Sequence, residues 1–190
     1  MDGQVLDVIE QLERFMATVD DAMAIPRDAA EFTHALVLAT RPKLAVEIGT
    51  SYGYSGLWIA SAFRGHGGRL ITIDHLPRKT EAALTRFGAA GLMECIEART
   101  GKALDILPSV RGPIDFVLND ADKENCIRYI DMLADRLSDR AVVLTDNVVS
   151  HAAQLAEFVE WIRGHPCFAS ARVPVGNGME MSVKLGGGRG

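Results

Sequence analysis

The sequence contains few cysteines. Its 190 residues include three, Cys95, Cys126 and Cys167, which are odd in number and far apart along the chain. This spacing argues against a disulfide framework and against a structural zinc site. A reducing compartment is therefore the natural location, and we expect a cytoplasmic protein.

Long apolar runs and an excess of positive charge are also lacking. No stretch is long and apolar enough to cross a bilayer, and the first 16 residues mix charged with apolar side chains, unlike a signal peptide. The formal net charge of -5 removes the electrostatic footprint of a nucleic-acid or anionic-membrane binder. We expect a small-molecule partner, with neither nucleic acid nor membrane.

What the chain does contain is a repeated alternation of strand and helix patterns. It predicts repeated βα units and hence a doubly wound α/β fold, with a mainly parallel sheet covered by helices on both faces. The Asn-Gly step within Gly176–Gly178 is typical of a hairpin and predicts an antiparallel edge, which makes seven strands. The predicted strands are residues 44–48, 69–73, 95–99, 114–119, 141–145, 169–175 and 179–185, and the predicted helices between them are 54–63, 78–90, 102–107, 127–137 and 152–163.

The length suits one domain spanning residues 1–190, with helices in residues 1–40 and a disordered glycine-rich tail at 186–190. The first helix carries an apolar stripe at helical spacing that has to be buried. It can pack either on its own domain or on a second subunit. Because the chain has little spare core to cover it, we expect a homodimer. The stripe consists of Val5, Ile9, Leu12 and Met16.

Glycines follow the first predicted strand, where the chain turns into a helix. Gly49 and Gly53 allow a ligand to approach the backbone closely, at the edge where open α/β sheets bind ligands. Glu47 stands where a dinucleotide-binding turn has glycine, and its carboxylate would repel a pyrophosphate. A cationic or amine-bearing ligand fits better, which disfavours a nicotinamide-dependent dehydrogenase.

An acidic residue also ends the second predicted strand. Asp74 is placed to accept hydrogen bonds from two ribose hydroxyls, so the turn and Asp74 together indicate a nucleoside without phosphate. The alternative is that Glu47 caps the turn and Asp74 caps the following helix.

Together these segments resemble the small cation-dependent O-methyltransferases, the family of catechol and caffeoyl-coenzyme A O-methyltransferases. The resemblance covers about residues 23–185 and implies a Rossmann-like S-adenosylmethionine-dependent methyltransferase. Its most specific segments are Asp120-Ala121-Asp122-Lys123 and Asp146-Asn147. The residues that the resemblance places around the cofactor are Glu47, Gly49, Gly53, Ser55, Asp74, Ala103, Asp120 and Asp122.

The same resemblance implies that Asp120, Asp146 and Asn147 hold a divalent cation and that Lys123 is the catalytic base. Oxygen ligands favour Mg²⁺, with Ca²⁺ or Mn²⁺ as alternatives. A cation would bind two adjacent hydroxyls of a phenolic or catechol-like acceptor and make one easier to deprotonate. The alternative is that Asp146 and Asn147 cap the next helix and that Lys123 pairs with Glu124 in solvent.

Some positions differ from the usual family pattern. Asn119, Cys126 and Ser150 replace residues that are commonly apolar or aromatic, so we expect an altered acceptor pocket. His151 could touch the metal or the substrate, although a lone histidine at a helix start is more often a surface residue. Two other functions stay open, a metal-independent O- or N-methyltransferase of another metabolite and a protein that binds the cofactor without turnover.

Overall fold

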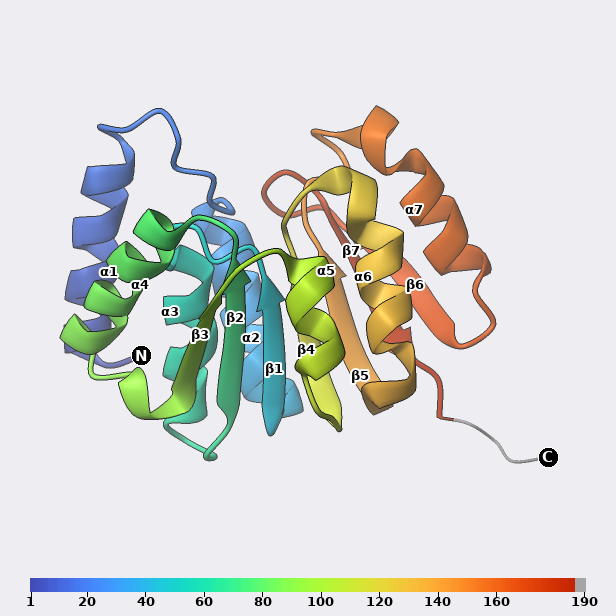
Figure 1. Ribbon diagram of the computed structural model, residues 1–190, viewed down its shortest axis with the longest axis horizontal. Coiled ribbons are helices and arrows are strands. Elements are labelled where there is room, and N and C mark those ends of the chain that lie inside the picture. The colour runs from blue at the N-terminus through green and yellow to red at the C-terminus, as the bar shows by residue number, and fades with distance from the viewer. Residues whose placement is uncertain (187–190) are drawn as a thin grey trace.

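The computed structural model describes residues 1–186 and contains a seven-stranded sheet (Figure 1). The strand order is β3-β2-β1-β4-β5-β7-β6, parallel except for β7, which pairs antiparallel with β5 and β6. This confirms the predicted fold class and the C-terminal hairpin. The strands are β1 (Leu44–Ile48), β2 (Arg69–Asp74), β3 (Ile96–Thr100), β4 (Ile114–Asn119), β5 (Leu137–Thr145), β6 (Phe168–Val173) and β7 (Met179–Lys184).

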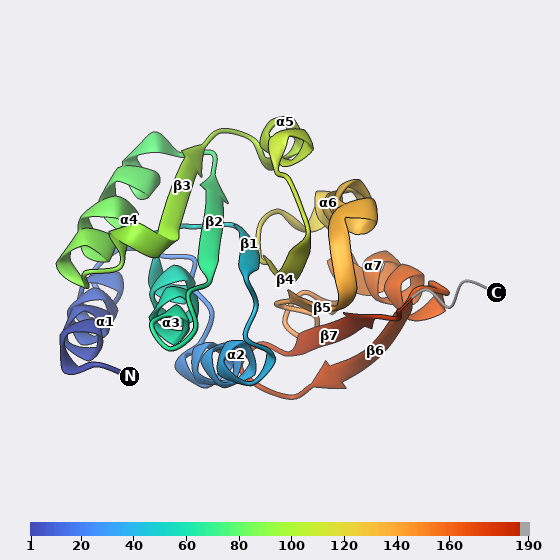
Figure 2. The ribbon, with the colours of Figure 1, turned by 90° about the horizontal axis from the view of Figure 1, so that it is seen from below.

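Helices cover both faces of the sheet (Figure 2). Residues of α1 to α4 belong to one hydrophobic core and residues of α5 to α7 to the other. The helices are α1 (Gly3–Met16), α2 (Arg27–Thr40), α3 (Tyr54–Phe63), α4 (Pro77–Ala89), α5 (Ala103–Ile106), α6 (Cys126–Leu133) and α7 (Ala152–Gly164).

The two cores follow from the alternation of side chains along the central strands. In β1, Ala45 packs in the first core and Val46 in the second, and all five residues of the strand are buried. Strands of a parallel sheet with two covered faces are apolar throughout, as this one is except for Glu47. The exception marks the edge where the strands end.

The predicted helix at residues 127–137 is wrong at its C-terminal end. The α-helix stops at Leu133, a short 3₁₀ turn follows, and β5 already begins at Leu137. Leu137 pairs with Ile114 of β4, and the Arg136 side chain donates hydrogen bonds to the carbonyl oxygens of Leu107 and Val110. These long-range contacts override a helical pattern that is locally continuous.

The apolar stripe of α1 is covered within its own chain. Val5 and Ile9 are fully buried, Leu12 is 1% exposed, and the three belong to the same core as α3 and α4. Met16 is partly buried against this core. The first helix therefore packs on its own domain. The expectation of a homodimer was based on an uncovered stripe, so it no longer has this support.

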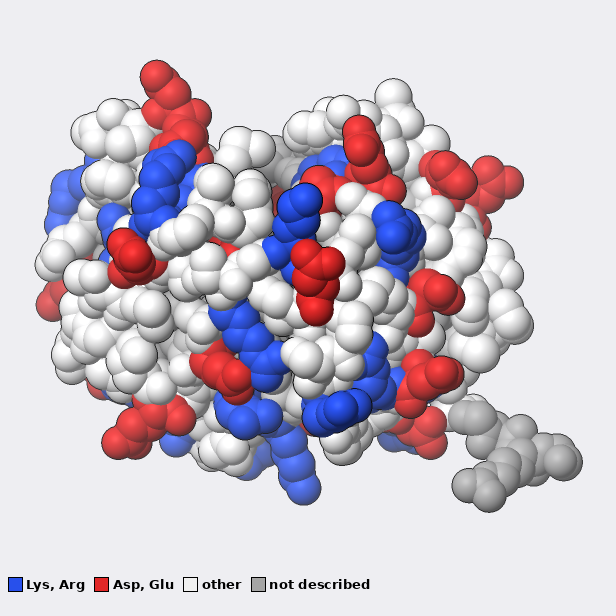
Figure 3. Space-filling view, viewed as in Figure 1, with Lys and Arg blue, Asp and Glu red and all other residues white. Residues whose placement is uncertain are grey.

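The tail expected to be disordered at 186–190 lies outside the described residues from 187 onward. Across residues 1–186, none of the helices has the length and apolar composition needed to span a membrane. Acidic and basic side chains are intermixed on the face shown in Figure 3, and this face is hollowed at the top, where the strands end.

Because Leu12 is buried inside the monomer, Leu12→Ala should lower the free energy of unfolding by about 2 to 5 kcal/mol. The measurement is urea denaturation at a micromolar protein concentration. Asp7→Ala is the matched control on the exposed side of α1, and it should change the free energy of unfolding by less than about 0.5 kcal/mol. A loss below about 1 kcal/mol for Leu12→Ala would contradict the packing of α1 on its own domain.

Candidate functional site

The predicted glycine turn lies between β1 and α3, at the carboxyl end of the sheet. Gly49 has a φ of +107° and Gly53 a φ of +90°, both in the region that favours glycine. A Cβ on Gly49 would lie 2.3 Å from the carbonyl oxygen of Asp120. The absent side chain therefore lets the end of β1 touch the segment that follows β4, between the two strands where the strand order reverses.

Glu47 is fully buried at the end of β1. Its Oε2 accepts a hydrogen bond of 2.5 Å from the Thr72 hydroxyl, and its Oε1 has no partner among the described residues. Burial raises the pKa of Glu47 to about 7, although the hydroxyls of Ser55 and Thr72 favour the charged form. The alternative of a capping carboxylate is therefore not what the structure shows for Glu47.

Asp74 ends β2 and binds two backbone groups. Its Oδ2 accepts from the Ser51 N–H at 2.7 Å and its Oδ1 from the Leu76 N–H at 2.9 Å. The second contact is to the N-cap residue of α4, which has no side-chain cap, so Asp74 does not cap that helix as the alternative supposed. The contact with the Ser51 N–H joins β2 to the glycine turn and holds the Asp74 carboxylate beside that turn. Each oxygen keeps a lone pair for a further donor.

The second half of the site follows β4 and β5. The Lys123 Nζ lies 3.3 Å from the Asp120 Oδ1 and forms an ion pair with it, and both side chains are 15% exposed. Burial is the largest cause that raises the pKa of Asp120 to about 7, with Lys123 opposing it and Asp146 adding to it. Lys123 thus pairs with Asp120, and the expected alternative of a solvated pair with Glu124 is not observed.

Asp146 and Asn147 lie beside this pair at the end of β5. Asp146 is 1% exposed, and its Oδ2 accepts from the Asn147 amide at 2.9 Å. Its Oδ1 has no partner among the described residues, and burial raises its pKa. The N-cap of α7 is His151, without a side-chain cap, so neither residue has the helix-capping role of the alternative.

The C-terminal hairpin supports the loop that follows these residues. The backbone N–H of Val148 donates to the Gly178 carbonyl at 3.0 Å, and those of Val149 and Ser150 donate to the Asn177 carbonyl at 3.1 Å. Gly176 donates to the Asp28 carboxylate at 2.8 Å. The hairpin thereby joins the start of α2 to the loop after β5.

The remaining predicted site residues are Ser55, Ala103 and Asp122. Ser55 is buried in the first turn of α3, and Ala103 begins α5 just after β3. Asp122 is exposed, and its two oxygens are already engaged by Asn125 and by the Tyr129 hydroxyl. A ligand would have to share this carboxylate with both partners.

Two of the positions expected to reshape the acceptor pocket do not line it. Asn119 and Cys126 are 0% and 1% exposed and lie in the interior beneath the site. The Asn119 amide contacts the Thr145 hydroxyl at 3.4 Å, an in-register neighbour on β5 that sequence periodicity does not identify. Ser150 is exposed and hydrogen-bonded to the His151 ring at 2.9 Å, so these two residues remain at the rim of the site.

Sequence reasoning missed a buried lysine at the same edge. Lys79 is 6% exposed and donates to the Asp21 carbonyl oxygen at 2.7 Å and to the Ser51 hydroxyl at 3.3 Å. A signal was present, because Lys79 lies on the same helical face of α4 as the buried residues Ala83 and Phe87.

The fold resembles solved methyltransferases closely. An O-methyltransferase of Streptomyces achromogenes in complex with SAM superposes with a TM-score of 0.84 at 27% identity, covering 98% of this chain and 91% of that one. An O-methyltransferase of Bacillus cereus in complex with SAH gives 0.82 at 26% identity, covering 97% and 91%.

Sequence comparison gives the same relationship. The chain is 40% identical over 146 residues to a catechol O-methyltransferase of Mycobacterium tuberculosis, covering 72% of this chain and 64% of that protein. It is 32% identical over 140 residues to a catechol O-methyltransferase of Niastella koreensis, of which it spans 63%. The profile of the O-methyltransferase family matches residues 3–185. Since this match includes both halves of the site and almost the whole fold, the chain belongs to the O-methyltransferase family.

Proposed function

We propose that the protein is an S-adenosylmethionine-dependent O-methyltransferase that moves a methyl group to a hydroxyl of a small phenolic or catechol-like acceptor with the help of a divalent cation. One observation carries the proposal. A glycine turn with buried carboxylates and a carboxylate-lysine pair lie at the same edge of the sheet, joined by the contact of Gly49 with Asp120. The relatives named catechol O-methyltransferase support the acceptor class.

The cofactor half of the site suits a cationic nucleoside. Within residues 1–186, one buried oxygen of Glu47 has no hydrogen-bond partner, and such a group is costly unless a ligand donor completes it. The ammonium group of S-adenosylmethionine is a donor of the right charge. Asp74, held in place by Ser51 and Leu76, accepts the ribose hydroxyls with its remaining lone pairs.

The acceptor half fits a hard cation. In residues 1–186, no three His, Cys, Asp or Glu side chains gather as a metal group, but the candidate set here is two carboxylates and one amide. In the described part of the chain, one buried oxygen of Asp146 has no hydrogen-bond partner, and Asp120 is a close acidic neighbour. A cation would relieve both the lost hydrogen bond and the repulsion. Asp120, Asp146 and Asn147 would hold this cation, most suitably Mg²⁺.

When bound, the cation supplies Lewis acidity that makes an acceptor hydroxyl easier to deprotonate. Lys123 is the residue placed to accept the hydroxyl proton. It would do so as a neutral amine, after its ammonium group has given a proton to solvent. The acceptor oxygen forms a bond to the methyl carbon while the bond from that carbon to sulfur breaks. The electron pair stays on sulfur and leaves neutral S-adenosylhomocysteine.

The decisive experiment combines binding with turnover. Calorimetry with S-adenosylhomocysteine and NAD tests the cofactor, and we expect saturable binding of the first only. Methyl transfer is then assayed against a panel of catechols with Mg²⁺ and with EDTA. Full activity in EDTA would favour the metal-independent alternative, and cofactor binding without turnover on any acceptor would favour the binding protein.

Glu47→Gln should stabilise the free protein at the expense of ligand binding. Folding raises the pKa of the Glu47 carboxyl from 4.5 to about 7. Between these two pH values the carboxyl is ionised in the unfolded chain but still protonated in the folded protein. The free energy of unfolding therefore falls as the pH rises from 4.5 to 7. At pH 8 the variant should therefore gain roughly 2 to 3 kcal/mol in free energy of unfolding, and the gain should vanish as the pH falls toward 4.5.

Urea denaturation across this pH range measures the effect, with exposed Glu157→Gln as the matched control. The affinity for S-adenosylmethionine should fall in Glu47→Gln and not in the control. Equal stability of both variants at pH 8 would refute the raised pKa of the buried Glu47 carboxyl.

Asp146→Asn should lower metal affinity and turnover together, because the site loses one negative charge while keeping its shape. We expect a fall in turnover on the order of 100-fold, as for the loss of several kcal/mol of charge stabilisation. Mn²⁺ calorimetry and methyl-transfer rates measure the two effects, and S-adenosylhomocysteine binding should persist. Asp139→Asn, on the exposed part of the same strand, is the matched control. Lost turnover with intact metal binding would remove Asp146 from the metal site.

Lys123→Met should lower turnover by about 100-fold or more, because the acceptor loses its general base. Binding of Mn²⁺ and S-adenosylhomocysteine should be retained, which separates this variant from Asp146→Asn. Rates measured from pH 6 to 10 should rise with pH in the unchanged protein and lose this rise in the variant. Activity within about 3-fold of the unchanged protein would show that another group takes the proton.

A further inference from the structure

Residues 17–26 connect α1 to α2 and contact the glycine turn. Asp21 of this segment is hydrogen-bonded to Tyr52, and other residues of the segment line a pocket together with Tyr54. The Asp21 carboxylate accepts a hydrogen bond from the Tyr52 hydroxyl at 2.9 Å and pairs with Arg78. Arg78 also donates to the Tyr52 hydroxyl at 3.1 Å. The segment is thus attached through its acidic residue to an aromatic residue of the turn and a basic residue of α4.

Lys79 is the buried member of this attachment. Its ammonium group donates to the Asp21 carbonyl and the Ser51 hydroxyl and lies 5.3 Å from the centre of the Tyr52 ring. A lysine that is only 6% exposed is costly to desolvate, and these contacts, together with the nearby Asp21 carboxylate, offset that cost. None of the reactions proposed above uses it.

The contacts of Lys79 lead directly to the ribose carboxylate. Ser51 has a φ of +45°, a left-handed conformation that is unfavourable for serine, and in this conformation its N–H donates to Asp74 Oδ2 at 2.7 Å. Lys79 donates a hydrogen bond to the side-chain hydroxyl of the same serine. It therefore fixes a strained residue whose backbone orients Asp74.

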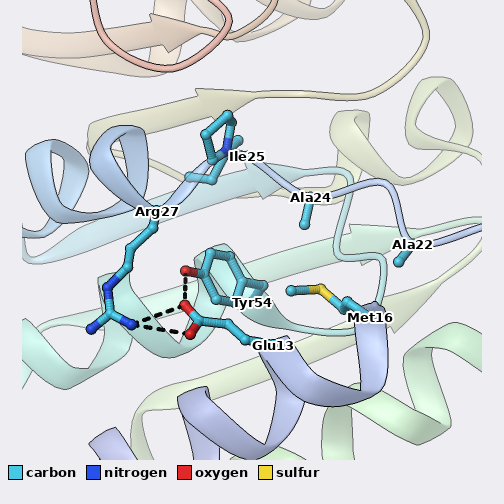
Figure 4. A pocket seen from close by; sticks show the side chains of 8 residues that line it. Glu13, Met16, Ala22, Ala24, Ile25, Arg27 and Tyr54 are labelled. Carbon is cyan, nitrogen blue, oxygen red and sulfur yellow. Dashed lines mark hydrogen bonds and ion pairs between the residues drawn. The ribbon is translucent and has the colours of Figure 1, made fainter. Parts of the chain in front are cut away.

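The other end of the segment is held near Tyr54. The Tyr54 hydroxyl donates to Glu13 at 2.6 Å, and Arg27 pairs with Glu13 at 3.0 Å (Figure 4). These three residues line a pocket of about 430 Å³ together with Ala22 and Ala24 of the segment. Tyr52 and Tyr54 flank Gly53, so residues 17–26 extend across the N-terminus of α3, from one side of the turn to the other.

We propose that Lys79 is a positioning residue for the adenosyl cofactor, which holds Ser51 for Asp74 and keeps residues 17–26 closed over the glycine turn. The inference rests on the proposed cofactor site. Its physical basis is preorganisation: without Lys79 the turn has to be ordered when the ligand binds, and the ligand leaves more easily. Lys79 touches neither the acceptor nor the transferred methyl group, so it affects cofactor affinity and residence time and leaves the chemical step unchanged.

The test compares Lys79→Met with Lys43→Met, an exposed lysine before β1 at the opposite end of the sheet. Calorimetry and competition stopped-flow with S-adenosylhomocysteine measure affinity and dissociation rate at 10 °C. We expect Lys79→Met to weaken affinity and to speed dissociation about 10-fold, as for the loss of hydrogen bonds to a charged group. At saturating S-adenosylmethionine its kcat should stay within about 3-fold of the unchanged protein, so the loss appears in KM.

Hydrogen exchange gives a second readout that a merely structural role would not change. Amides of residues 17–26 should be protected by S-adenosylhomocysteine in the unchanged protein and in Lys43→Met, but much less in Lys79→Met. A folded Lys79→Met with unchanged affinity and protection overturns the inference, even if its thermal midpoint is lower. If Lys79→Met does not fold, Tyr52→Phe and Asp21→Asn decide, and unchanged dissociation rates in both overturn it.

The outcome for the unchanged protein separates the two proposals. If it binds S-adenosylhomocysteine and Lys79→Met binds equally well, only the role of Lys79 fails. If the unchanged protein and Lys43→Met both fail to bind S-adenosylhomocysteine, the proposed cofactor site fails, and the inference drawn from it fails as well.

Discussion

The contact between Gly49 and the backbone of Asp120 is the constraint on which the site depends. It places the end of β1 against the segment after β4 at a distance that no Cβ permits. The carboxylates of the proposed cofactor half, on β1 and β2, thereby come within reach of those that follow β4 and β5. Any larger residue at position 49 would push apart the two groups between which a methyl group has to move, and near-attack geometry tolerates little such displacement.

Buried carboxyl groups are present in both halves of the site. Burial raises the pKa of Glu47, Asp120 and Asp146, and repulsion between neighbours adds to the effect for Glu47 and Asp120. These groups reduce the stability of the free protein and become favourable only when cations share their environment. A sulfonium cofactor, its ammonium group and a metal ion all carry the required charge.

The sequence predicted the fold and the placement of the site well, because both depend on local patterns. Alternating strands and helices located β1, β4 and the hairpin to within a residue or two, and the glycine turn and strand-end carboxylates do lie together at the carboxyl edge of the sheet. Prediction failed where distant segments meet. The early start of β5 depends on Leu137 pairing with Ile114, and the covered stripe of α1 depends on a core built by α3 and α4. Asn119 at the end of β4 and Cys126 at the start of α6 are both buried, because other elements cover them in a way that position in a motif does not reveal.

The hydrogen bonds from the loop after β5 to the carbonyls of Asn177 and Gly178 have a consequence for how the protein is made. Strands β1 to β5 and the turn that follows β1 are synthesised before the hairpin, and a nascent chain can begin to fold as it leaves the ribosome. The loop bearing Asp146 and Asn147 lacks its hydrogen bonds to the Asn177 and Gly178 carbonyls until the residues of the hairpin have been added. Because β7 inserts between β5 and β6, the acceptor half is completed last, after the cofactor half has its full set of residues. The nascent chain therefore contains every residue of the proposed cofactor half before the loop of the proposed acceptor half gains its hairpin contacts.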